Sequence, residues 1–420
     1  MKFSELDLKP DILKALTDMG YQDLTPIQEE TFFPILYGRD LLARAETGSG
    51  KTAACGIPLV QKIDPLLNAI QALILVPTRE LALQYVEEIN KISSFTEVTP
   101  FAIFGGFSME IQKAKLRDKV HILVATPGRL IDFLYNTKAI DLSSVRTLVL
   151  DEADEMLKMG FVEDVDFILS CMVHPHQTLF FAATMPPEID RLVKRYLRDP
   201  IRVELNKEQV APQSLVHHFQ FTDQRSRLKD LIDYLNREPI SQAILFCNSR
   251  VHSEKLVREL EKKFQSIGYI HGGLEQTKRT SLYERFRRKE LTFLVATDVA
   301  GRGLDFSHVS HVINYDYPAD PESYTHRTGR TGRMGRSGTA LTFVTDRDLQ
   351  NFKTLLRANR ILPVWRGDAP RLDAAHRPGR KPGDQRKKTF KKRPRPRQPG
   401  RSTSAARSDF RQRENQVSPV

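Results

Sequence analysis

The chain has 420 residues, which is long for one hydrophobic core and favours two or three domains. Its 40% hydrophobic and 28% charged residues are ordinary for a soluble globular protein. Three scattered cysteines without CxxC spacing argue against a disulfide framework or zinc site and predict a reducing cytoplasm. The first residues lack the apolar segment of a signal peptide, and no run approaches the roughly 18 apolar residues of a membrane span.

The net charge of +12 is concentrated at one end of the chain. Residues 367–420 hold 16 Lys and Arg against 5 Asp and Glu, which leaves 48 basic and 47 acidic residues in 1–366. The rest of the chain is therefore close to neutral, and any attraction for an acidic partner is expected from the basic end.

Short apolar, β-rich runs alternate with helical patterns through the first half of the chain. After a short run at 41–43, the predicted strands are 72–76, 101–104, 121–125, 147–150 and 178–182. Helix-like segments such as 79–90 and 188–197 lie between or after them. Continuous Val, Ile and Leu runs without alternation indicate strands that are buried on both faces of a parallel sheet.

The same scheme repeats in the second half. Predicted strands lie at 243–247, 268–272, 292–297, 311–316 and 339–344. We therefore predict an α/β fold of two tandem doubly wound parallel-sheet domains. A polar stretch with a proline sets the linker at 206–213, between domains at 1–205 and 214–365. Residues 366–420, rich in Pro, Arg and Lys, are expected to form a disordered basic tail.

The segment AETGSGKT at residues 45–52 follows the first apolar run and opens a helix-like segment. Small residues let backbone N–H groups curl around a polyphosphate, with Lys51 on the β/γ phosphates and Thr52 on Mg²⁺. The general pattern begins with Gly where this chain has Ala45. The alternative is an ordinary turn before a helix. The residues of this segment that we expect to bind the nucleotide are Ala45, Thr47, Gly48, Ser49, Gly50, Lys51 and Thr52.

The acidic sequence DEAD at residues 151–154 comes directly after the predicted strand 147–150. A doubly wound sheet places its ligands at the carboxyl ends of its strands. There Asp151 would bind Mg²⁺ and Glu152 would orient the attacking water. Taken alone, these residues could be an acidic helix start. Together with the phosphate loop, they predict an ATP-hydrolysing motor.

With these motifs the chain resembles the bacterial-type DEAD-box RNA helicases of helicase superfamily 2, over about residues 1–365. The resemblance implies two RecA-like domains, of which the first binds ATP. It assigns adenine recognition to Gln28, whose amide can pair with both N6 and N7 of adenine. The same element includes Phe3 and Tyr21.

The resemblance also implies an RNA-binding surface of segments that follow strands. Backbone amides, hydroxyls and arginines there grip sugar-phosphate without reading bases. Each segment alone could be a turn or a helix cap. The residues assigned to RNA are Pro77, Thr78, Arg79, Gly106, Thr126, Pro127, Gly128, Arg129, Arg250, Gln276, Arg279 and Thr297. The family often has an acidic residue where this chain has Gly273.

The second domain is expected to complete the ATP site. By resemblance Asp305 contacts the ribose, and Arg330 and Arg333 in HRTGRTGR at 326–333 are arginine fingers. A permanently charged guanidinium forks onto phosphate oxygens and neutralises the charge of phosphoryl transfer. The catalytic set is thus Lys51, Asp151, Glu152, Arg330 and Arg333, with Thr52 and Asp151 on the metal.

One departure concerns coupling between ATP hydrolysis and strand separation. Where the family reads Ser-Ala-Thr, this chain has Ala182, Ala183 and Thr184. We expect ATP and single-stranded RNA together to close the cleft between domains and to unwind short duplexes or remodel ribonucleoprotein. The alternatives are a nucleotide-controlled RNA clamp or annealing chaperone, and a DNA-acting helicase of the same superfamily. The tail is a second expected RNA contact, with ribosome-assembly or RNA-decay proteins as further partners.

Overall fold

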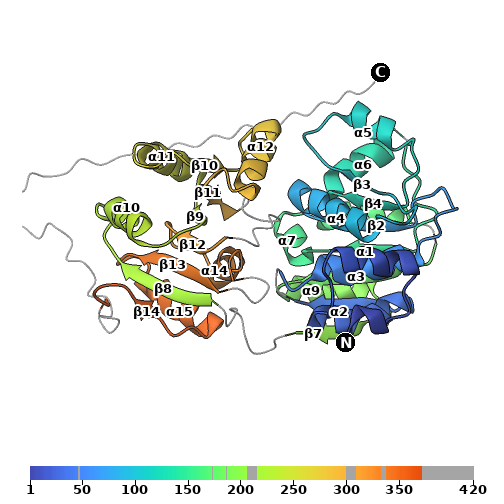
Figure 1. Cartoon of the computed structure of the whole chain (residues 1–420), viewed down its shortest axis with the longest axis horizontal. Coiled ribbons are helices and arrows are strands. Elements are labelled where there is room, and N and C mark those ends of the chain that lie inside the picture. The colour runs from blue at the N-terminus through green and yellow to red at the C-terminus, as the bar shows by residue number, and fades with distance from the viewer. Residues whose placement is uncertain are drawn as a thin grey trace, which may run out of the picture. The chain divides into compact units, whose positions relative to one another are not determined.

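The computed structural model describes residues 1–45, 48–137, 139–172, 174–185, 187–205, 215–298, 309–332 and 337–370. Residues 1–370 form one compact unit. Within it, two seven-stranded sheets carry the helices on their faces (Figure 1). We refer to residues 1–205 as the first lobe and to residues 215–370 as the second lobe. None of the helices within these described ranges is long and apolar enough to cross a membrane.

The first sheet has the order β3-β4-β2-β5-β6-β1-β7, and every strand pair in it is parallel. Its strands are β1 (Leu41–Arg44), β2 (Ala72–Leu75), β3 (Pro100–Ile103), β4 (Ile122–Ala125), β5 (Thr147–Leu150), β6 (Gln177–Ala182) and β7 (Ile201–Glu204).

Helices of the first lobe alternate with these strands. They are η1 (Phe3–Glu5), α1 (Pro10–Asp18), α2 (Pro26–Leu36), α3 (Lys51–Lys62), α4 (Arg79–Ile92), α5 (Met109–Lys115), α6 (Pro127–Asn136), α7 (Ala153–Lys158), α8 (Val162–Ser170) and α9 (Pro187–Tyr196). Residues of β2 divide between two hydrophobic cores, Ile74 in the core under α1–α4 and Leu73 in the core under α6–α9. The sheet is therefore covered on both faces, as continuous apolar strands require.

The second sheet repeats the arrangement in the order β10-β11-β9-β12-β13-β8-β14. Its strands are β8 (Leu215–Phe221), β9 (Ala243–Cys247), β10 (Ile267–Ile270), β11 (Phe293–Thr297), β12 (His311–Asn314), β13 (Gly338–Val344) and β14 (Val364–Trp365). Its helices are α10 (Arg227–Arg237), α11 (Arg250–Glu261), α12 (Gln276–Arg287), α14 (Pro321–Thr328) and α15 (Leu349–Asn359).

The predicted α/β fold with two doubly wound parallel sheets is confirmed. Three strands were not predicted, namely β7, β8 and β14. In β8, buried and exposed residues alternate, and two histidines interrupt its apolar pattern. The predicted linker and nearly all of the predicted tail lie outside the described residues, so the domain boundaries stay predictions.

Candidate active site

The phosphate-loop segment joins β1 to α3 at the carboxyl edge of the first sheet. Gly48 and Gly50 have φ values of 89° and 97°, a left-handed conformation that favours glycine. Helix α3 begins at Lys51, so its N-terminal N–H groups face the loop. The Lys51 ammonium is 7% exposed and donates to the carbonyl of Ala45 at 2.8 Å. Glycines that open the backbone and a buried cation beside a helix N-terminus suit a polyphosphate. The predicted contact Thr47 lies outside the described residues.

Gln28 lies directly against this loop. Its Oε1 accepts from the Thr25 backbone at 2.9 Å, and its Nε2 donates to the Gly50 carbonyl at 3.3 Å. A Cβ on Gly50 would lie 2.8 Å from that Nε2, so another residue there would displace the Gln28 amide. The predicted neighbours Phe3 and Tyr21 stack on each other with ring centroids 5.8 Å apart. Phe3 is only 2% exposed and belongs to the core.

The acidic segment begins where β5 ends, as predicted from the sequence. Asp151 is 2% exposed, and its two carboxylate oxygens accept different hydrogen bonds. Oδ1 accepts from the Glu152 backbone at 2.8 Å, and Oδ2 accepts from the Tyr85 hydroxyl at 2.7 Å. Glu152 has a φ of 51°, which a non-glycine residue rarely adopts. Such backbone is costly, and its occurrence beside the phosphate loop makes Glu152 a candidate functional residue.

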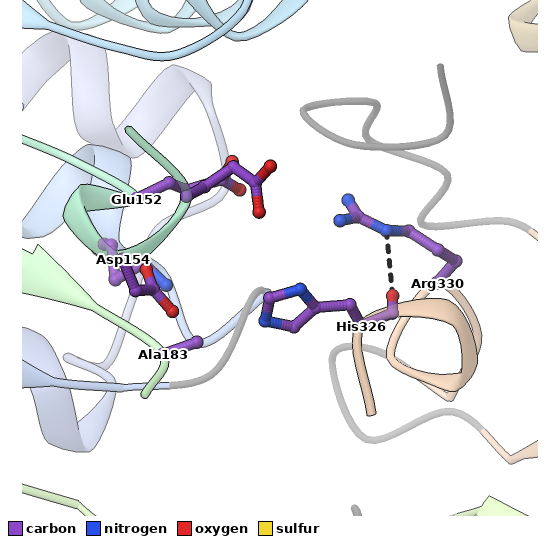
Figure 2. A pocket seen from close by; sticks show the side chains of 7 residues that line it. Glu152, Asp154, Ala183, His326 and Arg330 are labelled. Carbon is purple, nitrogen blue, oxygen red and sulfur yellow. Dashed lines mark hydrogen bonds between the residues drawn. The ribbon is translucent and has the colours of Figure 1, made fainter. Parts of the chain in front are cut away.

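Residues from both lobes line one pocket beside Glu152. They are Lys51, Glu152, Asp154, Glu155, Ala183, His326 and Arg330. Figure 2 shows Glu152 and Asp154 on one side of it, and His326 and Arg330 on the other. Burial raises the pKa of Glu152 to about 7, although the nearby Arg330 and Lys51 cations oppose that shift. A carboxyl group with such a pKa exchanges protons near neutrality, as a base that orients water must.

Arg330, one of the two predicted fingers, is 3% exposed and donates from Nε to the His326 carbonyl at 3.2 Å (Figure 2). Burial lowers the pKa of His326 to about 4, so its ring is neutral at physiological pH. The second predicted finger, Arg333, and the predicted ribose contact Asp305 lie outside the described residues.

Arg327, in the same motif, has a structural role that the sequence did not reveal. Its guanidinium is 1% exposed and donates to both oxygens of Asp298 at 2.5 and 2.7 Å. It also donates to Asn248 at 2.6 Å and to the Asp316 carbonyl at 2.8 Å. A buried arginine satisfied in this way holds the ends of several strands together.

In the segment that contains Ala182, the contacts with acidic side chains are made by Thr184. Ala182 is fully buried at the end of β6, and its carbonyl accepts from Ala45 at 3.1 Å. The backbone and hydroxyl of Thr184 lie 3.0 and 2.8 Å from Oδ2 of Asp154. The same hydroxyl lies 2.6 Å from Oε1 of Glu322 in the second lobe. Glu322 also forms an ion pair with Lys158.

Asp154, Glu322 and His326 bring potential metal-ligand atoms within 4.8 Å of one another. The carboxylate of Asp154 accepts from the Thr184 backbone and lies within hydrogen-bond distance of its hydroxyl, and that of Glu322 is paired with Lys158. We therefore interpret this cluster as a contact between lobes.

The predicted Mg²⁺ residues, Thr52 and Asp151, supply the hard oxygen ligands that this ion prefers.

The predicted RNA-binding residues of the first lobe follow β2, β3 and β4. Arg79 stacks its guanidinium 4.9 Å from the centre of the Phe104 ring, and burial lowers its pKa to about 10. Gly106 has a φ of 73°, and a Cβ there would collide with Arg79. Arg129 donates to the Phe107 carbonyl at 3.0 Å. The other five are Pro77, which is buried, Thr78, which caps α4, Thr126, which caps α6, and Pro127 and Gly128, which open it.

The predicted RNA-binding residues of the second lobe lie at or after the ends of β9, β10 and β11. Arg250 opens α11 and lies 3.4 Å from Glu254. Arg279 on α12 lies 2.9 Å from Glu80 of the first lobe. Thr297 ends β11 and is 8% exposed. Gln276 is the first residue of α12, and its side chain lies outside the described part. The predicted segments thus gather at the carboxyl edges of the two sheets.

The chain has two RecA-like sheets. The first lobe carries the phosphate loop and the acidic segment, and the second lobe contributes a buried arginine. Together these features define a two-lobed nucleoside triphosphatase. The DEAD/DEAH box helicase profile matches residues 25–192, and the helicase conserved C-terminal domain profile matches residues 224–335. The DEAD-box ATP-dependent RNA helicase CshA of Bacillus cereus is 41% identical over 373 residues, 89% of this chain and 71% of the relative. CshA of Bacillus subtilis is 42% identical over 85% of this chain and 71% of its own length.

Solved structures give the same result. Dbp5 of S. cerevisiae bound to RNA and ADP BeF3 has a TM-score of 0.79 and 28% identity, and covers 87% of this chain and 95% of its own. Mss116p bound to ssRNA and AMP-PNP has a TM-score of 0.79 and 30% identity, and covers 87% of this chain and 79% of its own. The chain belongs to the DEAD-box ATP-dependent RNA helicases, of bacterial type.

Proposed function

We propose that this helicase hydrolyses ATP only when its two lobes together complete the active site. The observation that carries this proposal is the pocket that Lys51 and Glu152 share with Arg330. The first lobe supplies the phosphate-binding and water-orienting groups, and the second lobe supplies the guanidinium. Neither lobe alone holds both, so hydrolysis depends on closure.

Each residue has a distinct role in this proposal. The loop at 45–52 and Lys51 hold the phosphates of ATP, while Gln28 selects adenine. Glu152 orients the attacking water and receives its proton, for which its pKa of about 7 is suited. Arg330 stabilises the charge that develops on the transferred phosphoryl group. Thr52 and Asp151 would hold Mg²⁺, which neutralises phosphate charge when it is bound.

RNA is proposed to favour the same closed arrangement through the arginines at the strand ends of both lobes. Arg79 and Arg129 belong to the first lobe, and Arg250 to the second, so one strand that contacts all three is bound best when the lobes are closed. By linkage, ATP and RNA then tighten each other's binding. A strand held across both lobes is expected to lose its partner from a short duplex.

The experiment that tests this proposal compares RNA-stimulated ATP hydrolysis in Lys51→Ala, Glu152→Gln and Arg330→Ala proteins. Each is expected to lose at least about 100-fold in turnover, since removal of one transition-state contact costs that much. Glu163→Gln, an exposed acidic change in α8, is the matched control. Undiminished turnover in Arg330→Ala would show that the second lobe does not complete the site.

A nucleotide-controlled clamp or annealing chaperone is a second candidate, favoured by Ala182 in place of the family's serine. Short-duplex unwinding with ATP, with a non-hydrolysable analogue and without nucleotide separates the two functions. A helicase unwinds in the presence of ATP, whereas a clamp anneals strands or holds them without turnover. Comparing stimulation by RNA and DNA oligonucleotides tests the DNA-acting alternative.

We further propose that the basic tail adds a second, sequence-independent RNA contact, because 16 of the 54 residues at 367–420 are Lys or Arg. A cytoplasmic location is proposed on the basis of Cys55, Cys171 and Cys247, all of which are free thiols. Cell fractionation tests that location.

Ribosome-assembly or RNA-decay proteins remain predicted partners, to be identified by crosslinking in cells.

A further inference from the structure

Tyr85 lies on α4, outside all the residues to which the proposed function gives a role. Its ring is fully buried, and its hydroxyl donates to Oδ2 of Asp151 at 2.7 Å. The other oxygen of that carboxylate accepts from the Glu152 backbone at 2.8 Å. Two donors from different segments therefore fix the orientation of the Asp151 carboxylate.

A second side chain, that of Cys55, contacts the Tyr85 hydroxyl. Cys55, on the helix that begins with Lys51, lies with its sulfur 3.7 Å from the Tyr85 oxygen. A carboxylate only accepts, so the single phenolic hydrogen goes to Asp151. The one thiol hydrogen can go either to the Tyr85 oxygen or to the Thr52 carbonyl, which lies 3.4 Å from the sulfur.

The three side chains come from three elements that meet only in the fold. Cys55 belongs to α3, Tyr85 to α4 and Asp151 to the end of β5. Cys55 and Tyr85 thus connect the phosphate-binding helix to the acidic segment, and the hydrogen bond from Tyr85 ends on a carboxylate. None of the three side chains is more than 2% exposed, so water does not compete for these contacts.

We infer that Tyr85 is a positioning residue that holds the Asp151 carboxylate ready for Mg²⁺ when nucleotide is bound. This inference rests on the proposed role of Asp151 as a metal residue. Partners that orient metal-binding side chains typically contribute 10- to 100-fold in metal affinity. Without the hydroxyl, the carboxylate can rotate and must be reordered each time the ion is bound.

The test is the Mg²⁺ dependence of binding of a fluorescent, non-hydrolysable ATP analogue, which requires no turnover. Tyr85→Phe removes one oxygen atom and keeps the ring. We expect the half-saturating Mg²⁺ concentration to rise about tenfold. Binding of the analogue in EDTA is expected to be unchanged, because the loop at 45–52 is untouched. Turnover at saturating Mg²⁺ is expected to recover, whereas a merely structural role would lower it at every Mg²⁺ concentration.

Two further variants separate the possible outcomes. Cys55→Ser keeps a donor next to Tyr85 and is expected to shift the Mg²⁺ midpoint by less than about twofold. A shift as large as that of Tyr85→Phe would show that packing, rather than the hydroxyl, is responsible, and would overturn the inference. Asp151→Asn tests the metal role itself. If only Asp151→Asn changes the Mg²⁺ dependence, the inference on Tyr85 fails. If neither variant changes it, the proposed metal role fails as well.

Discussion

The hydroxyl of Thr184 lies 2.6 Å from Oε1 of Glu322 and 2.8 Å from Oδ2 of Asp154, which belong to different lobes. A hydroxyl has one hydrogen, so it can donate to only one of these carboxylates at a time. Lys158 also pairs with Glu322 and thereby brings a positive charge to the same point. Within residues 182–184, it is Thr184 that contacts the second lobe, while Ala182 is buried in its strand.

Thr184→Val removes the hydroxyl at almost constant volume. Because hydrogen bonds to charged groups contribute about 1.5–3 kcal/mol, we expect about tenfold fewer duplexes unwound per ATP hydrolysed. The measurement is duplex unwinding and phosphate release in the same reaction. Ala182→Ser is the control and is expected to change this ratio less. A larger gain from Ala182→Ser than the loss from Thr184→Val would place coupling at position 182.

Glu87 on α4 and Arg287 on α12 form an ion pair between the lobes at 2.6 Å. Both side chains are about two-fifths exposed, so only a small effect is expected. Glu87→Arg or Arg287→Glu should raise the RNA concentration for half-maximal ATPase about twofold, and the double exchange should restore it. Failure of the double exchange to restore it would show that this pair does not form during turnover.

The pKa of about 7 for Glu152 predicts a pH dependence of ATP hydrolysis. A raised carboxyl pKa means that the proton is still held in mildly acidic solution, where the group cannot accept one from water. We expect kcat/KM at saturating RNA to rise about tenfold per pH unit below 7 and to level off above about 8. His326, with a pKa of about 4, does not titrate in that range. A flat profile between about pH 6 and 8 would exclude Glu152 as the titrating base.

Gly273 leaves room for the Arg250 side chain, whose Cδ would lie 3.0 Å from a Cβ at that position. Gly273→Ala is expected to displace the guanidinium, and both Gly273→Ala and Arg250→Ala are expected to weaken RNA binding. When one phosphate contact to a single strand is lost, the slope of log binding constant against log salt concentration becomes shallower by about 0.7. Salt titrations of both single variants and the double variant check this. Additive losses would show that the two residues act independently.

Removal of residues 367–420 takes away a net charge of +11. We expect a higher RNA concentration for half-stimulation, a weaker salt dependence and similar turnover at saturating RNA. Steady-state ATPase titrations with RNA at two salt concentrations measure all three. A large fall in saturated turnover would instead give the tail a role in the chemistry.

The sequence alone determined the parallel sheets and the positions of most functional segments. Runs such as 147–150 are buried on both faces, and the acidic residues follow directly where such a strand ends. Local pattern is enough for this, because strand, turn and helix start are neighbours in the chain. Strand β8 was missed because His217 and His218 interrupt its apolar run.

Only the tertiary structure decided which distant residues meet. Tyr85 reaches Asp151 because β2, whose chain continues into α4, lies beside β5 in the sheet. Arg327 and Arg330 are three residues apart in the same motif. Arg327 nevertheless binds Asp298, whereas Arg330 lines the pocket with Glu152. The phosphate loop and the acidic segment could therefore be predicted from the sequence. The contacts that support them depend on strand order and helix rotation, which the local sequence pattern does not specify.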